Sequence, residues 1–186
     1  MVNRMHCQMH REMNDRRGFT LVEMLVVIAI IGLLLGLMMP VLASARNMAR
    51  KTDCQIRLKQ IGLAMNSYVD ASGNFPDVGQ MPSLAPTYPT MVSVLGPYTE
   101  QNKQLFACPM DTEYFSKEGL SYEYRSLDLA GKTRVQSLII QLPGNKKRSR
   151  PSTEVMLMYD FGPFHGAATQ NGARNVVYLD GHVEPL

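Results

Sequence analysis

The sequence predicts an α+β protein in which a long N-terminal helix, made of a membrane half and an amphipathic half, packs on a small C-terminal antiparallel β-sheet, a pilin-like fold. Three observations predict it: an apolar run of membrane length, a helical period that continues beyond that run, and strand-like segments that end in an Asp-Gly pair. With 186 residues, of which 45% are hydrophobic and 19% charged, the chain suits one domain with an attachment. This composition excludes a polytopic membrane protein and a disordered polyelectrolyte.

The apolar run extends from Phe19 to Met39 and reads FTLVEMLVVIAIIGLLLGLMM, 21 residues with one charge, Glu23. At ~1.5 Å per residue it makes roughly 32 Å of helix, enough for a hydrocarbon core of about 30 Å. We therefore expect a transmembrane helix over residues 19–40. Gly32 and Gly36 form a small-xxx-small pattern that permits close helix contact in lipid.

After Pro40, where we expect a bend, the helical period continues over residues 41–72 as an amphipathic segment that ends before Gly73. The apolar face consists of Val41, Ala45, Met48, Ala49, Thr52, Ile56, Ile61, Ala64, Met65, Tyr68 and Val69. This half is expected to pack on a globular domain over residues 73–186.

That domain divides into an irregular part, 73–133, and a β-sheet, 134–186. The irregular part is rich in proline, with one short helix expected near residues 90–95. Strands are expected at Arg134–Leu142, Glu154–Phe161 and Asn175–Leu179. Asp180-Gly181 then predicts a hairpin with a type I′ turn, in which both central residues take positive φ.

The distribution of charge and the motifs in the sequence argue against two classes of function, nucleic-acid binding and catalysis. The net charge of +3 is concentrated in residues 1–18, which argues against a nucleic-acid partner. The basic run Lys146-Lys147-Arg148 reads as a solvated loop rather than a site for an anionic partner. The sequence lacks G-x-S-x-G, P-loop, HExxH and C-x-x-C motifs, so we do not expect an enzyme.

A removable secretory signal is the alternative for the apolar run. Cleavage at Ala43-Ser44-Ala45 would release a secreted enzyme or adhesin that begins at Arg46. The run is longer than the roughly 7 to 15 residues of a signal-peptide core and carries Glu23, which disfavours this reading. Basic residues flank both ends of the run, so charge does not set its orientation.

The junction Arg16-Arg17-Gly18-Phe19-Thr20-Leu21-Val22-Glu23 resembles the N-terminal processing motif of type IV pilins and type II secretion pseudopilins. The resemblance implies a cytoplasmic leader, residues 1–18, that a prepilin peptidase and N-methyltransferase removes after Gly18 before methylating Phe19. It further implies a subunit held in the bacterial inner membrane, with its C-terminal domain outside the cytoplasm. The subunit would assemble with other pilin-like subunits into a pilus or a secretion pseudopilus.

Glu23 has a physical role in that picture. Cleavage creates an amine on Phe19, and in packed helices Glu23 can pair with the amine of its own or a neighbouring subunit, which relieves an unpaired carboxylate in lipid. Gly32, Gly36 and Pro40 belong to the same assembly helix. Two readings remain open: Glu23 merely snorkels to the interface, or the protein is a membrane-tethered ligand- or cation-binding module that never polymerises.

The C-terminal part resembles a broad bacterial group of prepilin-type proteins, on Pro97-Tyr98, the segment 106–111, Ser121-Tyr122 and the ending from His165. That group usually has nine residues between its histidine and Asp-Gly, whereas fourteen separate His165 from Asp180 here. Asp160, His165, Asp180 and His182 would hold a divalent cation if they converge, with calcium ahead of zinc because some pseudopilins bind calcium through C-terminal loops. Alternatively, Asp180 shapes a turn and the histidines lie on loops or a sheet edge; no other cofactor is expected.

The sequence contains three cysteines. Cys7 would leave with the leader, and Cys54 and Cys108 would remain as either a disulfide in an oxidising compartment or two separate buried thiols.

Overall fold

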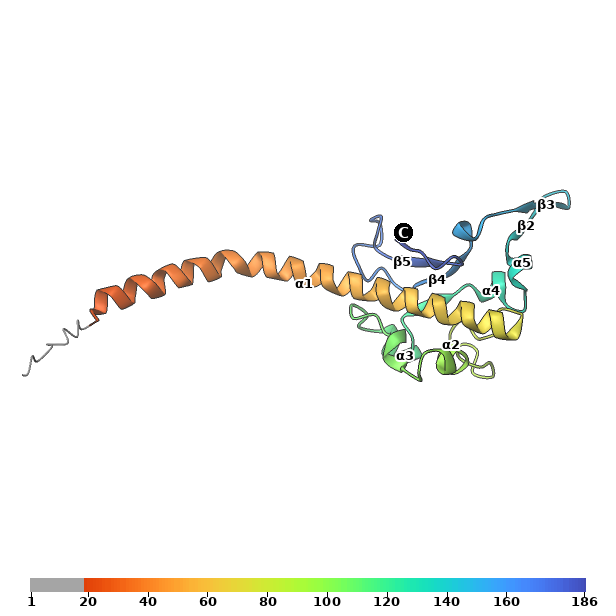
Figure 1. Ribbon diagram of the computed structural model, residues 1–186, viewed down its shortest axis with the longest axis horizontal. Coiled ribbons are helices and arrows are strands. Elements are labelled where there is room, and N and C mark those ends of the chain that lie inside the picture. Colours follow the sequence, from red (N-terminus) through yellow and green to blue (C-terminus); the bar gives the residue numbers. More distant parts are fainter. Residues whose placement is uncertain (1–18) are drawn as a thin grey trace, which may run out of the picture. The chain divides into compact units, whose positions relative to one another are not determined.

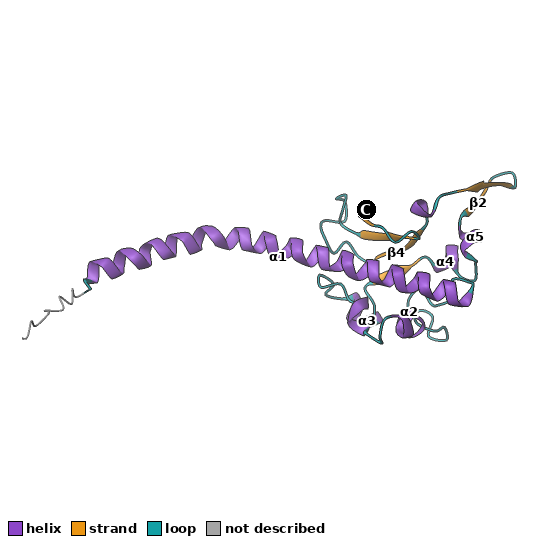
Figure 2. Cartoon of the chain, in the orientation of Figure 1, coloured by secondary structure: helices purple, strands orange, loops and turns teal. Residues whose placement is uncertain are grey.

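The computed structural model describes residues 19–186, which belong to two compact units, one that ends at Ser44 and one from Ala45 to Leu186. Helix α1, Leu21–Ser72, contributes to both units. The α+β prediction is confirmed, because the second half of this helix packs on a small antiparallel sheet (Figures 1 and 2).

The remaining elements are short. The helices are α2, Met91–Leu95; η1, Gly96–Tyr98; η2, Lys103–Phe106; α3, Tyr114–Glu118; α4, Ser126–Leu129; α5, Arg134–Ser137; and η3, Ser152–Glu154. The strands are β1, Tyr122–Tyr124; β2, Ile139–Leu142; β3, Lys146–Ser149; β4, Met156–Asp160; β5, Asn175–Tyr178; and β6, Val183–Pro185. The predicted short helix near residues 90–95 is α2, which Thr90 caps by accepting the backbone N–H of Ser93 at 3.1 Å.

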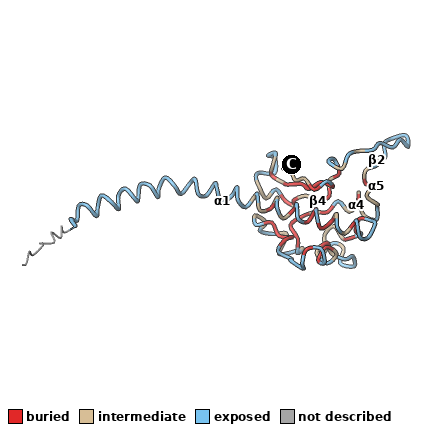
Figure 3. The backbone as a smooth tube through the Cα atoms, viewed as in Figure 1, coloured by how far each residue is buried: buried red, intermediate tan, exposed pale blue. Residues whose placement is uncertain are grey.

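In the first unit, helix α1 continues through Pro40, and every residue from 19 to 44 is exposed (Figure 3). The helix is long and apolar enough to cross a membrane.

The second unit is built around a four-stranded antiparallel sheet in the order β1-β4-β5-β6. From Cys54 onward, α1 lies between this sheet and the segment that carries η1 and η2 (Figure 1). On the sheet side, the Asn66 side chain donates a hydrogen bond to the carbonyl of Leu179. On the other side, the ring of Tyr68 meets the ring of Tyr98 in η1 edge to face. The largest fully buried side chains include Tyr122, Tyr124, Phe75, Phe106, Leu58, Ile61, Met65, Met91, Leu95, Leu129, Leu157 and Met158. Burying this apolar surface is the main stabilising term of the unit.

The buried face of α1 differs in part from the predicted stripe. Ile61, Ala64, Met65 and Val69 are buried as expected, but Met48 and Ile56 are exposed. The buried residues of the helix are Cys54, Leu58, Ile61, Gly62, Ala64, Met65 and Val69. The face that meets the domain therefore begins later in the helix and is rotated from the predicted one.

The predicted strand Arg134–Leu142 is wrong in its first half, which is helix α5. A capping box explains the change: the Thr133 hydroxyl accepts the N–H of Gln136, and the Gln136 side chain accepts the N–H of Thr133. In addition, the segment predicted to be irregular contributes β1, an edge strand that pairs with β4. The basic run 146–148 is a strand rather than a loop, although it is fully exposed in the β2–β3 hairpin (Figure 3).

The predicted hairpin at Asp180-Gly181 joins β5 to β6, but its turn is not type I′. Of the two residues only Gly181 has positive φ, 88°. The Gly181 N–H donates to the Tyr178 carbonyl at 2.9 Å, and the Tyr178 N–H donates to the His182 carbonyl at 3.0 Å. This pattern fits a three-residue loop with glycine in the left-handed position, so Asp180 keeps an ordinary backbone conformation.

Candidate functional site

The first candidate site is the start of α1, where Thr20 and Glu23 bind each other. The Thr20 N–H and the Thr20 hydroxyl each donate to Glu23 Oε2 at 2.8 Å, and the Glu23 N–H donates to Thr20 Oγ1 at 3.2 Å. This is a capping box, which satisfies two otherwise free backbone donors of the first helical turn. Sequence reasoning missed it, although the Thr-x-x-Glu spacing before an apolar run is its recognised signal.

The surface that follows is apolar and packs against no other part of residues 19–186. Phe19 is 68% exposed. No atom of the described residues lies within 4 Å of the position that a Cβ would take at Gly32 or Gly36, so both glycines leave room for another helix. Pro40 lies inside the continuous helix, and Gly18 lies outside the described residues.

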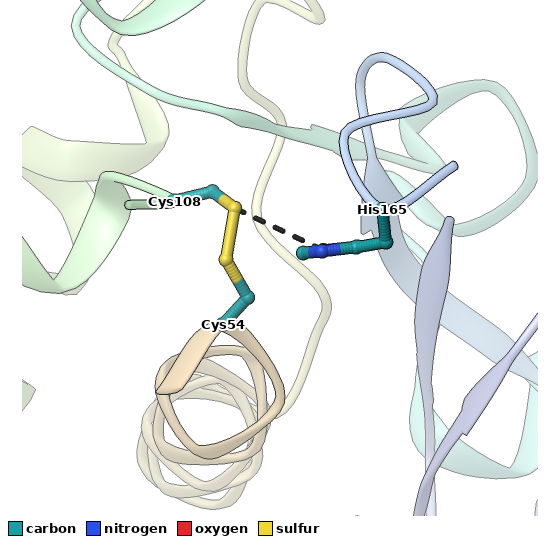
Figure 4. A group of neighbouring side chains, drawn as sticks. All are labelled: Cys54, Cys108 and His165. Carbon is teal, nitrogen blue, oxygen red and sulfur yellow. Dashed lines mark hydrogen bonds between the residues drawn. A yellow bond between two sulfur atoms is a disulfide. The ribbon is translucent and has the colours of Figure 1, made fainter. Parts of the chain in front are cut away.

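The second candidate site is a buried cluster around a disulfide. Cys54 on α1 and Cys108, which follows η2, are bonded to each other with their Cα atoms 5.2 Å apart (Figure 4). Arg57, one turn along the helix, donates to the carbonyls of Gln104 and Ala107, both at 2.8 Å. The bond and these contacts hold the η2 segment against α1.

His165 lies beside this disulfide and Asp160 lies next to His165, both with fully buried side chains. His165 Nε2 is 3.1 Å from Asp160 Oδ2 and 3.9 Å from Cys108 Sγ, and His165 Nδ1 is 3.2 Å from Met110 Sδ. Asp160 Oδ2 also accepts the backbone N–H of Asn175 at 2.6 Å and its side-chain amide at 2.9 Å. By contrast, Asp160 Oδ1 is buried and has no hydrogen-bond partner among residues 19–186.

Asp180 and His182 form a separate pair on the β5–β6 turn, with His182 Nδ1 2.5 Å from Asp180 Oδ1. The His182 ring stacks on Tyr178, with ring centroids 4.3 Å apart. Partial burial opposes ionisation of Asp180, but hydrogen bonds from His182 outweigh it and lower the pKa of the carboxyl.

The four residues predicted as cation ligands therefore lie as two pairs rather than one group. Antiparallel pairing sets Tyr159 opposite Val176 and Met156 opposite Tyr178. Asp160 consequently lies at the end of the sheet where β5 begins, and Asp180 follows the other end of β5. In the part of the chain that the structure describes, the group with three close metal-ligating atoms is instead Cys54, Cys108 and His165.

Two residues near this group carried part of the family resemblance but were not predicted as site residues. Met110 contacts the imidazole of His165, as described above. Asp111 accepts the backbone N–H groups of Glu113, Tyr114 and Phe115, each at 2.8 Å, at the start of α3, and its Oδ2 accepts the Ser121 hydroxyl at 2.6 Å. Both lie in the Cys-Pro-Met-Asp segment, and this clustering of chemically versatile residues was the available signal.

Comparison with known proteins gives two family matches. Residues 13–39 match the prokaryotic N-terminal methylation motif, and residues 43–129 match a family described as a protein of unknown function (DUF1559). No curated protein and no solved structure matches the chain. The first match covers the predicted cleavage junction and the apolar half of α1, and the second covers Cys54, Cys108 and β1.

Proposed function

We propose that this pilin-like chain is a filament subunit of a pilus or a type II secretion pseudopilus. A prepilin peptidase cuts after Gly18 and methylates Phe19. The mature helix then leaves the membrane by packing against the helices of other pilin-like subunits, and the assembly supports surface filaments or protein secretion.

The observation that carries the proposal is an exposed apolar helix with a single ionisable side chain near its start. From residue 19 to residue 44 all side chains are exposed, and Glu23 is the one acid among those before Pro40. A surface this apolar is stable only when lipid or other helices cover it. Lipid covers it before assembly, and neighbouring subunits cover it afterwards.

The capping box refines the role of Glu23. Both contacts from Thr20 use Oε2, and within the described residues Oε1 accepts no hydrogen bond. One carboxylate can therefore cap its own helix and still accept the methylated Phe19 amine of a neighbour through its second oxygen. A buried charge that is satisfied only at the correct stagger sets the register between subunits.

The disulfide supports the proposed orientation, in which the second unit lies outside the cytoplasm. Disulfides persist in oxidising compartments outside the cytoplasm. The Cys54–Cys108 bond therefore favours a second unit that is exported, with residues 1–18 on the cytoplasmic side before cleavage.

The test follows processing and extraction separately in the native host. Intact mass and N-terminal sequencing of the wild-type protein should give a chain that starts at N-methyl-Phe19. Glu23→Ala should be cleaved as efficiently but should be absent from the sheared filament fraction, whereas Glu154→Ala, a matched change at an exposed residue of η3, should behave as wild type.

Two results would contradict the proposal. A native chain that retains residues 1–18, or one that begins at Arg46, removes the processing step. A Glu23→Ala protein with full function, and no filament in either strain, would instead favour a membrane-tethered module that does not polymerise.

A further inference from the structure

We propose that Cys54, Cys108, His165 and Asp160 form a binding site for a divalent thiophilic cation of the zinc class when the two cysteines are reduced. The disulfide and the cation are then alternative ways of closing the same cluster. The proposal rests on the second unit alone and does not depend on filament assembly.

The distances around His165 Nε2 are those of a metal site that is nearly formed. In a tetrahedral zinc site with bonds of roughly 2.0 to 2.3 Å, neighbouring ligand atoms lie roughly 3.3 to 3.8 Å apart. Cys108 Sγ lies 3.9 Å from Nε2, and Cys54 Sγ lies within 4.8 Å of both Cys108 Sγ and the imidazole nitrogen. The Asp160 carboxylate adjoins this group of three through Oδ2, which lies 3.1 Å from Nε2. Reduction frees the two sulfurs to separate around a central ion.

Asp160 is suited to be the fourth ligand. Its side chain is fully buried and its Oδ1 has no hydrogen-bond partner, an arrangement that costs free energy in a protein interior. Coordination through Oδ1 would satisfy that oxygen. Oδ2 would keep both donors from Asn175, so the carboxylate would remain oriented when His165 turns its Nε2 lone pair to the ion.

The imidazole is also held in a suitable way. A histidine that binds metal through Nε2 carries its proton on Nδ1, which needs an acceptor. Met110 Sδ lies 3.2 Å from Nδ1 and can accept that proton weakly. A pocket lined by Asn47, Met48, Lys51, Met110, Phe164, His165 and Gly166 lies next to the cluster.

A dithiol can supply the electrons and protons that reduction of the Cys54–Cys108 disulfide requires. The disulfide accepts two electrons and two protons from the dithiol and becomes two thiols, while the dithiol becomes a disulfide. The cation then displaces the two thiol protons and binds both thiolates. Two thiolates and one carboxylate against a doubly charged cation leave one net negative charge, whereas a monovalent cation would leave two in a buried site, which favours the divalent ion.

The experiment uses the full chain in detergent with the substitutions His6→Ala, Cys7→Ser and His10→Ala, which remove the other cysteine and two of the other histidines. The protein is reduced with a phosphine under anaerobic conditions, desalted, and titrated with Zn²⁺ against a chromophoric chelator. One equivalent should bind per reduced chain and none per oxidised chain. Co²⁺ in place of Zn²⁺ should give the absorption of a tetrahedral thiolate site.

Variants identify the ligands. His165→Ala should weaken Zn²⁺ binding by more than the ~10- to 100-fold typical of outer-shell substitutions. His182→Ala, which removes the remaining histidine on the exposed turn, should leave affinity and stoichiometry unchanged. Equal binding by the reduced chain and by Cys54→Ser, or loss of binding in His182→Ala, would overturn the proposal.

A second measurement needs no variant. Zn²⁺ should slow alkylation of Cys54 and Cys108 in the reduced chain by at least about tenfold, read by mass spectrometry of the labelled peptides. Alkylation at the same rate with and without Zn²⁺ would equally refute the site, whatever the folding of the variants.

Discussion

Gly62 and Val177 bring α1 and the central strand β5 into direct contact: a Cβ at Gly62 would lie 2.7 Å from Val177 Cγ2. Real Cβ atoms do not approach other atoms so closely, so glycine at this position sets the spacing between the helix and the sheet.

Gly62→Ala should therefore destabilise the second unit. Overpacking costs about 1–3 kcal/mol, and the better helix propensity of alanine returns about 1 kcal/mol. Denaturant unfolding of the full chain, followed by tyrosine fluorescence, measures the loss, since all eight tyrosines lie in the second unit. Gly36→Ala, which meets nothing within 4 Å, is the matched control and should not lower the unfolding free energy. Equal stability of Gly62→Ala and wild type would show that the helix can move away from β5.

Removal of the disulfide should cost more. Cys54 and Cys108 are separated by 54 residues, and the chain-entropy model assigns about 4 kcal/mol to closing such a loop in the unfolded state. The double variant Cys54→Ser/Cys108→Ser should lose about this much unfolding free energy in the absence of added metal. Cys7→Ser serves as the control. A loss below about 1 kcal/mol would mean that the unfolded chain already keeps these segments together.

The two aspartates of the C-terminal region should respond differently to truncation. Asp160→Ala leaves two buried donors of Asn175 without an acceptor, each at about 1–3 kcal/mol, so the unfolding free energy should fall by at least about 2 kcal/mol. Asp180→Ala removes contacts on a solvent-exposed turn and should cost about 1 kcal/mol or less. The same denaturant titration distinguishes them, and the reverse order would contradict the assigned geometry.

Alkaline pH should weaken the domain through Tyr178. Burial, followed by the hydrogen bond from its hydroxyl to Glu184 Oε1 at 2.5 Å, raises the pKa of Tyr178 to about 12. Because this pKa is raised on folding, its contribution to stability is complete below pH 10 and is lost as pH rises through about 12.

Absorbance titration of tyrosinate checks this pKa. Glu184→Gln should shift one tyrosine to ionise at lower pH, and Tyr178→Phe should remove that step. Tyr88→Phe, a change at an exposed ring, should leave the step in place. An identical titration curve for Glu184→Gln and wild type would count against the hydrogen bond.

Much of the fold could be predicted because its signals are long or chemically specific. The apolar run and its amphipathic continuation extend over many helical turns, and Asp-Gly between apolar strands marks the β5–β6 connection. Where the residue pattern was ambiguous or too short, local contacts determined the secondary structure. Thr133 and Gln136 turn the first half of an apolar strand-like run into α5, and β1 has three residues, too few for alternation to be visible.

The candidate site was less predictable because it depends on sheet register. Pairing of β4 with β5 separates Asp160 from Asp180, although both precede a histidine in the sequence. The approach of His165 to Cys108 joins residues 57 positions apart, and no local spacing encodes it. The sequence allowed Cys54 and Cys108 to form either a disulfide or two separate buried thiols, because sequence alone does not show whether two cysteines lie close together in the fold.

The cross-link also determines how the protein carries mechanical load. A pull applied along the chain from Phe19 towards β6 reaches Cys54 and passes through the sulfur bridge to Cys108, so the enclosed loop is not stretched. At about 3.4 Å per residue, the bond keeps a 54-residue segment, roughly 180 Å of contour length, from extending under the pull. The oxidised protein under tension therefore lengthens far less before it yields than the same chain with its bridge reduced, and single-molecule stretching with and without a reductant measures that difference.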